Sequence, residues 1–246
     1  MRHGRPIVLA ILLTLAASSS GSGAPDWPPF LRSSDQYPAH IATAVRRLWA
    51  DATFTRTVSA QPVPVPLAFY LRFIDTPDVT AAAARHLALT TYDVRVLGGD
   101  WYEADDGSRT HGVYHVLVRD GTRRVVVSWG THSGSILGTI GGSALTRLEF
   151  AEDGAGATQR LMVNAIIDDG LAAGLSRPIV LLFGWLVDRK LGEAFRTAAT
   201  VAEWARATPD AFCAWLDTAF AEPRRGAILR IFDECVATDR TAHARP

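Results

Sequence analysis

The sequence has few of the features that usually indicate a specific chemistry. Its 246 residues include only two cysteines, and Lys and Arg balance Asp and Glu at a formal net charge of zero. A neutral chain has no strong field to draw it onto nucleic acid or an anionic lipid surface. We therefore expect no nucleic-acid partner, and recognition must come from local features.

Motifs for nucleophilic catalysis and phosphate binding are also missing. Ser133 and Ser135 lie in THSGSILG, which lacks the GxSxG pattern of a serine hydrolase. Gly138, Gly141 and Gly142 precede an expected strand and do not open a helix, so they offer no helix N-terminus to a phosphate. We expect these glycines to form a flexible loop at the mouth of a cavity, and we assign no catalytic residue.

The histidines do not form an obvious metal site. His111 and His115 are four residues apart on an expected strand, roughly 13 Å, which is too far to share an ion. The alternative is a site in which His132 joins one of these two histidines across the sheet, with Glu103 or Asp105 nearby, weighed against ordinary, partly exposed histidines. We favour ordinary histidines and expect no metal and no cofactor.

The N-terminus has the pattern of a secretory signal peptide. Arg2 and Arg5 precede about a dozen apolar or small residues, and a small, polar run follows. The apolar run is shorter than the roughly 20 residues that span a bilayer, so an uncleaved anchor is the weaker alternative. We expect residues 1–24 to be removed, with cleavage after Ser19, Ser22 or Ala24, and the protein to be periplasmic or secreted.

Both cysteines lie near the C-terminus, in two helical patterns joined by a turn around Pro223 and Gly226. An antiparallel helical hairpin over residues 208–246 would bring Cys213 and Cys235 together. In an oxidising compartment they would form a disulfide, and the alternative is two buried free thiols.

The segment 25–66 contains an extended leader, one helix and a proline-rich connector. Ala39–Phe54 places Ile41, Val45 and Leu48, together with Trp49, on one helical face, which indicates a docking helix that packs on its own domain. QPVPVP then interrupts regular structure.

The segment 67–207 predicts an α+β domain. Leu67–Asp75 is aromatic and β-branched enough for a first strand, and Thr76 and Pro77 then start a short helix that would bury Val79, Ala83 and Leu87. Five β-rich runs follow, separated by Asp-Gly turn signals, and predict successive antiparallel hairpins: Val94–Tyr102, Gly112–Arg119, Arg123–Thr131, Ala144–Ala151 and Thr158–Ile167. The apolar run Ile179–Val187 leads into a long amphipathic helix, Asp188–Arg206.

This order of segments, from FYLRFID and TPDVTAAAARHL through SALTRLEFAEDGAGATQRLMVNAIID to DRKLGEAFRTAATVAEWARA, resembles the START-like (SRPBCC) helix-grip superfamily. The resemblance covers about 140 residues and is one of topology, without a diagnostic motif. It implies a curved antiparallel sheet wrapped on the long C-terminal helix, and a lipid or other hydrophobic small molecule bound between them. A minority of that superfamily are enzymes such as cyclases and hydrolases.

Alternation along the expected strands nominates the residues that would contact such a ligand. Trp101, Tyr114 and Trp129 are assigned to the inner face with Val116, Val127 and Leu148, and Trp185 to the apolar entry of the long helix. Arg147 is a candidate anchor for a carboxylate or phosphate, although strand arginines more often face solvent. The run Ile179–Val187 is a candidate for transient membrane contact, with burial as the default.

Three functions remain open. The first is an exported carrier of a lipid or another hydrophobic molecule. The second is an enzyme of the same fold that uses His132 and Glu103 for acid–base chemistry on a hydrophobic substrate. The third is a structural protein whose cavity is filled by side chains and whose terminal helices bind an unknown partner protein.

Overall fold

The computed structural model describes four stretches of the chain, residues 26–134, 138–154, 156–168 and 178–236, and only the backbone of residues 138 and 178–191. The expected signal peptide, residues 1–24, lies outside them. No helix in these stretches has the length and apolar character needed to cross a membrane.

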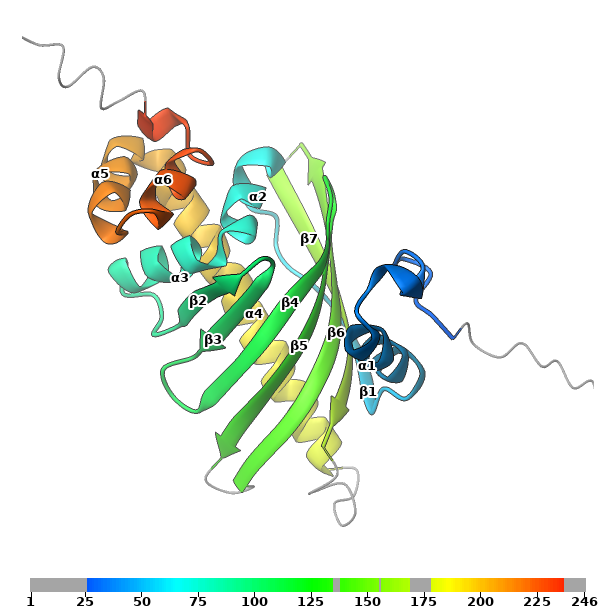
Figure 1. The fold of residues 1–246 in the computed structure, drawn as a ribbon. Helices are drawn as coiled ribbons and strands as arrows, with labels where there is room; N and C mark the ends of the chain where they lie inside the picture. Colours follow the sequence, from blue (N-terminus) through cyan, green and yellow to red (C-terminus); the bar gives the residue numbers. More distant parts are fainter. Residues whose placement is uncertain (1–25, 135–137, 155, 169–177, 237–246) are drawn as a thin grey trace, which may run out of the picture.

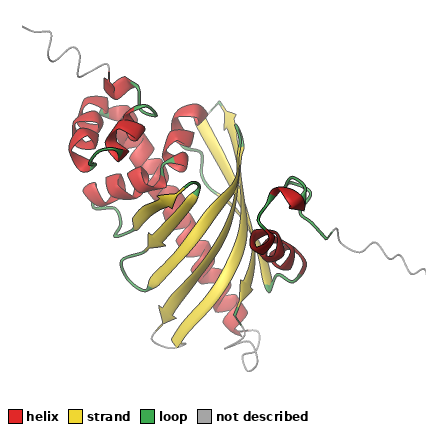
Figure 2. Cartoon of the chain, viewed as in Figure 1, coloured by secondary structure: helices red, strands yellow, loops and turns green. Residues whose placement is uncertain are grey.

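A seven-stranded antiparallel sheet forms the centre of the fold (Figures 1 and 2). Its spatial order is β1-β7-β6-β5-β4-β3-β2, so each strand after β1 pairs with the one that follows it in the sequence, and β1 closes the far edge against β7. The strands are β1 (Phe54–Ser59), β2 (Asp93–Gly98), β3 (Trp101–Asp105), β4 (Thr110–Arg119), β5 (Arg123–Gly134), β6 (Gly138–Asp153) and β7 (Gly156–Ile167).

Helices cover both faces of this sheet. They are α1 (Ala39–Ala50), preceded by a 3-10 turn at Ser34–Gln36, then α2 (Leu67–Asp75), α3 (Pro77–His86), α4 (Pro178–Ala207), α5 (Pro209–Ala219) and α6 (Arg224–Leu229). The 30-residue α4 runs along one face and α1 lies on the other (Figure 1). The α+β helix-grip fold expected from the sequence is confirmed.

The long helix is continuous through both segments that the sequence distinguished. It begins at Pro178, so the apolar run Ile179–Val187 and the amphipathic part belong to one helix. Phe195 packs against Leu161 and Val163 of β7, and Val201 is fully buried among α2, α3 and α5. This burial holds α4 across the sheet.

The first strand of the sheet is not where the sequence placed it. Leu67–Asp75 forms α2, and the prediction of a strand there is wrong. Its aromatic content is typical of a strand, but Tyr70 and Phe73 are three residues apart and both fully buried, which fits one face of a helix. β1 comes instead from Phe54–Ser59, where we expected the end of the docking helix; that helix stops at Ala50.

Glycines account for two further differences. Val94–Tyr102 was expected as one strand, but Gly98 and Gly99 have φ values of 118° and 56°, which turn the chain between β2 and β3. Gly141 and Gly142 were expected in a flexible loop; they lie in β6 instead, paired with Thr131 and Gly130 of β5. The prediction of a loop from these glycines is therefore wrong, because a glycine can also occupy a paired position within a long strand.

Thr76 and Pro77 mark the start of α3 as expected, with Val79 and Ala83 buried. The helix ends at His86, one residue before Leu87. The Thr76 hydroxyl donates to the Arg72 carbonyl oxygen at 2.6 Å and so closes α2 without capping α3.

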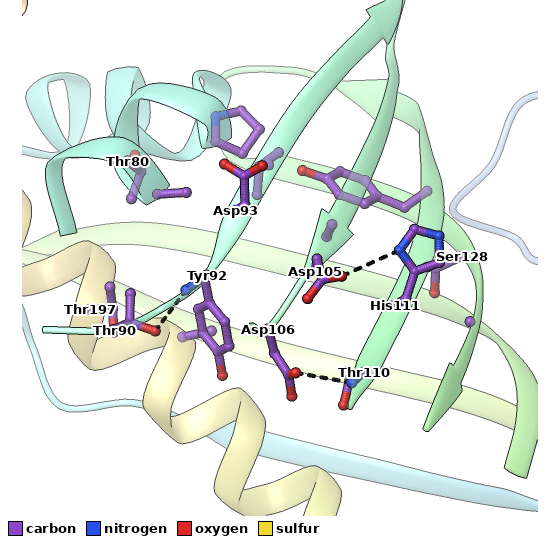
Figure 3. Close-up of a pocket in the computed structure, with 18 of the residues that line it drawn as sticks. Thr80, Thr90, Tyr92, Asp93, Asp105, Asp106, Thr110, His111, Ser128 and Thr197 are labelled. Carbon is purple, nitrogen blue, oxygen red and sulfur yellow. Dashed lines mark hydrogen bonds and ion pairs between the residues drawn. The ribbon is translucent and has the colours of Figure 1, made fainter. Parts of the chain in front are cut away.

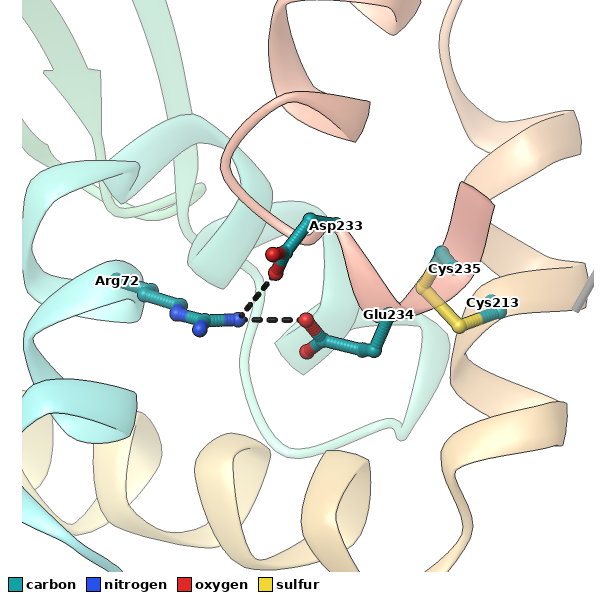
Figure 4. Close-up of a disulfide and its surroundings, with 5 residues drawn as sticks. All are labelled: Arg72, Cys213, Asp233, Glu234 and Cys235. Carbon is teal, nitrogen blue, oxygen red and sulfur yellow. Dashed lines mark hydrogen bonds and ion pairs between the residues drawn. A yellow bond between two sulfur atoms is a disulfide. The ribbon is translucent and has the colours of Figure 1, made fainter. Parts of the chain in front are cut away.

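The C-terminal helices α5 and α6 pack beside α2 and α4, and a disulfide between Cys213 and Cys235 ties α5 to the chain that follows α6 (Figure 4). Arg72 of α2 pairs with Glu234 at 2.6 Å and with Asp233 at 3.5 Å. These ion pairs and the disulfide fasten the chain after α6 to the helical layer.

Candidate functional site

The two faces of the sheet have different neighbours. We call the face covered by α4 the inner face and the face covered by α1 the outer face. On the outer face, Ile41 and Val45 of α1 pack against Val127 of β5 and Leu145 of β6. Because side chains alternate along a strand, Ser128 between Val127 and Trp129 points to the inner face.

A row of very small residues crosses the inner face. Ala104 of β3 pairs with Gly112 of β4, Gly112 pairs with Gly130 of β5, and Gly130 pairs with Gly142 of β6. Four neighbouring strands thus present at most a methyl group toward α4. The row leaves space between the sheet and the helix.

That space is a cavity of about 470 Å³ bounded by β2 to β5, α3 and α4 (Figure 3). Its volume lies within the roughly 300–1,000 Å³ of small-molecule sites. Most of its wall is apolar or small, including Phe73, Val94, Ala104, Ala194 and Ala198.

A second cavity of about 360 Å³ lies on the same face, toward β6, β7 and β1. Its wall contains Phe54, Ala144, Val163 and Ala165, which have inward-facing positions on the paired strands. Thr110, Ser128 and Gly130 belong to both cavities. The two spaces therefore meet near the start of β4 and the second half of β5.

Several polar side chains also border these cavities, and two of them bond to each other. The Thr110 hydroxyl oxygen lies 2.9 Å from Nδ1 of His132, directly opposite it on β5. The Ser128 hydroxyl donates to the Ala144 carbonyl oxygen at 3.5 Å, the long limit of a hydrogen bond.

Asp106 lies at the end of the first cavity, where β3 turns into β4 (Figure 3). One carboxylate oxygen accepts hydrogen bonds from the Ser108 hydroxyl and from the backbone N–H groups of Ser108, Arg109 and Thr110. Burial raises the pKa of this carboxyl, but the hydrogen bonds outweigh it and hold the pKa well below its usual range. Asp106 is therefore ionised at neutral pH and fixes the turn that carries Thr110.

The expected contact residue Tyr114 does lie at the first cavity. Its ring stacks on Tyr102 with centroids 5.0 Å apart, and Arg119 donates to the Tyr102 hydroxyl at 3.3 Å. Burial is the main cause that raises the pKa of Tyr114, and the negative charge of Asp78 adds to it. Tyr114 therefore stays a neutral phenol.

Trp101 and Trp129 have their indole rings on the outer face, so the assignment of these two side chains to the cavity is wrong. The indoles stack with centroids 6.0 Å apart, and Trp101 also stacks on His115 at 4.4 Å. Trp129 borders the first cavity, but its ring packs with the α1 cluster. Val127 belongs to the same outer cluster, whereas Leu148 packs on the inner side with Phe195 and its neighbours.

Arg147 also lies on the outer face and cannot anchor a ligand in the cavity. Its guanidinium carbon is 4.8 Å from the centre of the Phe30 ring, and one nitrogen is 3.2 Å from Glu149. The side chain thus holds the N-terminal segment. Trp185 lies in α4, in the part where only the backbone is described.

The sheet separates the residues of the suggested acid–base pair. Glu103 is on the outer face, 3.3 Å from His111 and paired with Arg95, whereas His132 is on the inner face. Asp105 is 3.8 Å from His111. In the described stretches, no three His, Cys, Asp or Glu side chains are arranged to hold a metal ion.

Sequence reasoning missed the residues that form the cavity, which are Thr110, Ser128 and the small-residue row. One signal was present. Gly112, Tyr114, Ser128 and Gly130 alternate with larger apolar residues along β4 and β5, which marks a face with unfilled space. Of the large aromatic side chains nominated from the sequence, Trp101 and Trp129 fill the opposite face.

No known protein-family model and no curated protein matches the chain. Among solved structures it is similar to a putative uncharacterized protein from Rhizobium leguminosarum, with 14% identity over 61% of this chain and 94% of that one and a TM-score of 0.42. It is also similar to Ara h 8.0201, with 14% identity, 61% and 98% coverage and a TM-score of 0.41. A third is the di-domain ARO/CYC StfQ from the steffimycin biosynthetic pathway, with 13% identity, 68% and 57% coverage and a TM-score of 0.42. At these identities and TM-scores the comparisons assign neither a family nor an activity to this chain.

Proposed function

We propose that the protein is an exported member of the START-like superfamily that holds a lipid or another hydrophobic small molecule between the inner face of the sheet and α4. The observation that carries the proposal is the cavity of about 470 Å³ over the Ala104, Gly112 and Gly130 floor. A protein whose core is filled by side chains would place larger residues at these positions, because cores pack to near-crystalline density. The apolar wall favours an apolar ligand.

The catalytic alternative has less support. Its two named residues, His132 and Glu103, lie on opposite faces of the sheet. The His132 ring at the inner face bonds to the Thr110 hydroxyl, and Glu103 on the other face cannot reach either group. Binding is therefore the function that the geometry supports best.

Nile red, a neutral dye that fluoresces in apolar surroundings, tests the proposal. The wild-type protein should bind the dye at one site, and Ala104→Phe should weaken binding by about tenfold or more because the ring fills the first cavity. Ala151→Phe introduces the same ring at an exposed position of β6 and should leave the affinity unchanged. No dye binding by the wild type, or equal binding by Ala104→Phe, would contradict the proposal.

Export is the second part of the proposal. It is supported by the N-terminal signal pattern in the sequence and by the Cys213–Cys235 disulfide, which is typical of oxidising compartments. Expression of the full chain in a Gram-negative host should yield a periplasmic product that begins after Ser19, Ser22 or Ala24, as measured by intact mass. A full-length product retained in the cytoplasm would count against export.

A further inference from the structure

A line of three hydrogen-bonded side chains connects the turn at Asp106 with the second cavity. The Thr110 hydroxyl oxygen lies 2.9 Å from His132 Nδ1, and the same hydroxyl bonds to the Asp106 carboxylate. Asp106 belongs to the turn between β3 and β4, Thr110 begins β4, and His132 is directly opposite Thr110 on β5. The line therefore runs from the end of the first cavity to the wall of the second.

The carboxylate fixes the direction of each hydrogen bond in this line. Because its pKa lies well below the usual range, Asp106 is ionised, and a carboxylate can only accept hydrogen bonds. The Thr110 hydroxyl has a single proton, which it donates to Asp106, so only its lone pairs are left for His132. Since two lone pairs do not bond to each other, Nδ1 of His132 carries a proton and donates it to Thr110.

This direction leaves the other ring nitrogen, Nε2, as a hydrogen-bond acceptor. In a neutral imidazole one nitrogen donates and the other accepts, and the partner of the first decides which is which. Among the residues whose side chains are described, none bonds to Nε2 of His132. His132 thus offers the second cavity an acceptor whose tautomer is set by its neighbours.

The sheet leaves room for a ligand beside the His132 ring. His132 lines the second cavity, of about 360 Å³. The next inner-face position along β5 is Gly130, which pairs with Gly142 of β6, so neither position places a side chain next to the imidazole. Ile140 and Val163 supply apolar wall in the same cavity. A largely apolar ligand over the glycines would bring one polar group against the ring.

The acceptor discriminates among polar groups of a ligand. An ether or ketone oxygen has lone pairs only and would face the lone pair of Nε2, whereas a hydroxyl has a proton to donate. A buried acceptor left without a donor forfeits the hydrogen bond and its desolvation is uncompensated. A hydroxyl on the ligand is therefore favoured at this point of the cavity.

We infer that the second cavity binds an apolar molecule through a phenol or alcohol hydroxyl that donates to Nε2 of His132, with Thr110 as a positioning residue that holds the acceptor tautomer. The inference rests on the proposed function and specifies its ligand class. It also gives the Asp106–Thr110–His132 line a role in recognition, in addition to the role of Asp106 in the turn.

Two ligands with the same rigid apolar frame test the inference. 4-Phenylphenol can donate a hydrogen bond, and 4-methoxybiphenyl cannot. In equilibrium dialysis the wild type should bind the phenol about fivefold to tenfold more tightly, the value of one hydrogen bond. His132→Phe keeps a planar ring without the acceptor and should reduce this preference to about twofold or less. His40→Phe makes the same change at an exposed position of α1 and should keep the preference.

The contrary outcomes separate the inference from the proposed function. Equal affinity of the wild type for the two ligands would overturn the inference. An equal preference in the wild type and His132→Phe would also overturn it, because the extra methyl group of the ether would then set the selectivity. If Nile red binds at the Ala104 site and neither biphenyl binds, the inference fails and the hydrophobic carrier stands. A wild type that binds neither a biphenyl nor Nile red would contradict the proposed function, and the inference with it.

Nitrogen NMR of the His132 ring tests the line of hydrogen bonds without relying on a substitution. At about pH 8 the wild type should carry the ring proton on Nδ1, and the Nε2 resonance should shift on binding of 4-phenylphenol far more than on binding of 4-methoxybiphenyl. Thr110→Ser keeps the hydroxyl and should keep this tautomer, whereas Thr110→Val should place the proton on Nε2 in part of the molecules. A proton on Nε2 in the wild type, or a Thr110→Val ring with the wild-type tautomer, would overturn the inference.

Discussion

Gly112 of β4 and Gly130 of β5 lie directly opposite each other on the inner face of the sheet. The strands are so close here that a Cβ on Gly112 would lie 3.1 Å from the Gly130 Cα and 2.6 Å from the Trp129 carbonyl oxygen. The pair therefore serves two purposes. It lets the strands approach closely, and it leaves the space that α4 covers.

Gly112→Ala should destabilise the fold by about 1–3 kcal/mol, because the added methyl group meets backbone atoms that must shift. Urea unfolding followed by circular dichroism measures the change. Gly121→Ala is the control: this glycine lies in the turn between β4 and β5, and its Cβ would meet nothing within 4 Å. A loss of stability as large for Gly121→Ala as for Gly112→Ala would refute the close-approach explanation.

A partly buried ion pair fastens α2 to the sheet. Arg124 of β5 donates from Nε and Nη2 to the two oxygens of Asp75, each at 2.7 Å, and its side chain is only 6% exposed. Arg124→Met should cost about 2–3 kcal/mol, since it leaves Asp75 with Arg119 as its remaining partner. Thermal or urea unfolding reports the difference.

Arg123→Met gives the comparison for this pair. Arg123 and Asp120 form an exposed ion pair within one turn, with side chains 34% and 42% exposed. Such pairs contribute at most about 1 kcal/mol. Similar losses for the two variants would mean that burial does not strengthen the Arg124 contact.

The turn at Asp106 should make stability depend on pH. The folded-state pKa of Asp106 lies well below its usual range, so its contribution is complete above the unfolded-state pKa of about 3.9 and is lost as the pH falls toward the folded-state pKa. Asp106→Asn should therefore be about 1–2 kcal/mol less stable than wild type at pH 7, and the gap should narrow below about pH 4.

Urea unfolding of the wild type and Asp106→Asn from pH 7 to pH 3 measures this gap. Asp51→Asn, at an exposed carboxylate after α1, should differ from wild type by less than about 0.5 kcal/mol throughout. A gap for Asp106→Asn that widens on acidification would contradict the assigned role of the hydrogen bonds.

The Cys213–Cys235 disulfide closes a loop with a sequence separation of 22 residues. Replacement of both cysteines by serine should lower stability by about 3 kcal/mol, chiefly through the greater freedom of the unfolded chain. The wild type under a thiol reductant should lose nearly the same amount. An unchanged unfolding midpoint in both cases would mean that the disulfide contributes nothing to holding the chain after α6 against α5.

The sequence allowed the fold to be predicted where local patterns agree with the tertiary structure. The Asp-Gly turns separate strands as expected, and the stripe of Phe195, Ala198 and Val201 defines the buried side of α4. Leu67–Asp75 was predicted wrongly. Its aromatic residues have a high intrinsic preference for strands, but the segment forms a helix that buries Tyr70 and Phe73 on one side.

The site was harder to predict for a physical reason. Alternation assigns Ser128 and Trp129 to opposite faces, but it does not tell which face the long helix covers. The large rings of Trp101 and Trp129 suggested the ligand side, yet they pack toward α1. A cavity is defined by missing side chains, and the glycines that produce it look like loop signals in a sequence.

The most direct test of the cavity is methyl NMR of the protein titrated with Nile red. We expect shifts for the methyl groups of Ala104, Ala144 and Ala165, which line the inner face. The methyl groups of Val127 and Leu145, on the outer face, should stay unchanged. Shifts confined to the outer-face methyl groups, or no shifts at saturating dye, would contradict a ligand site between the sheet and α4.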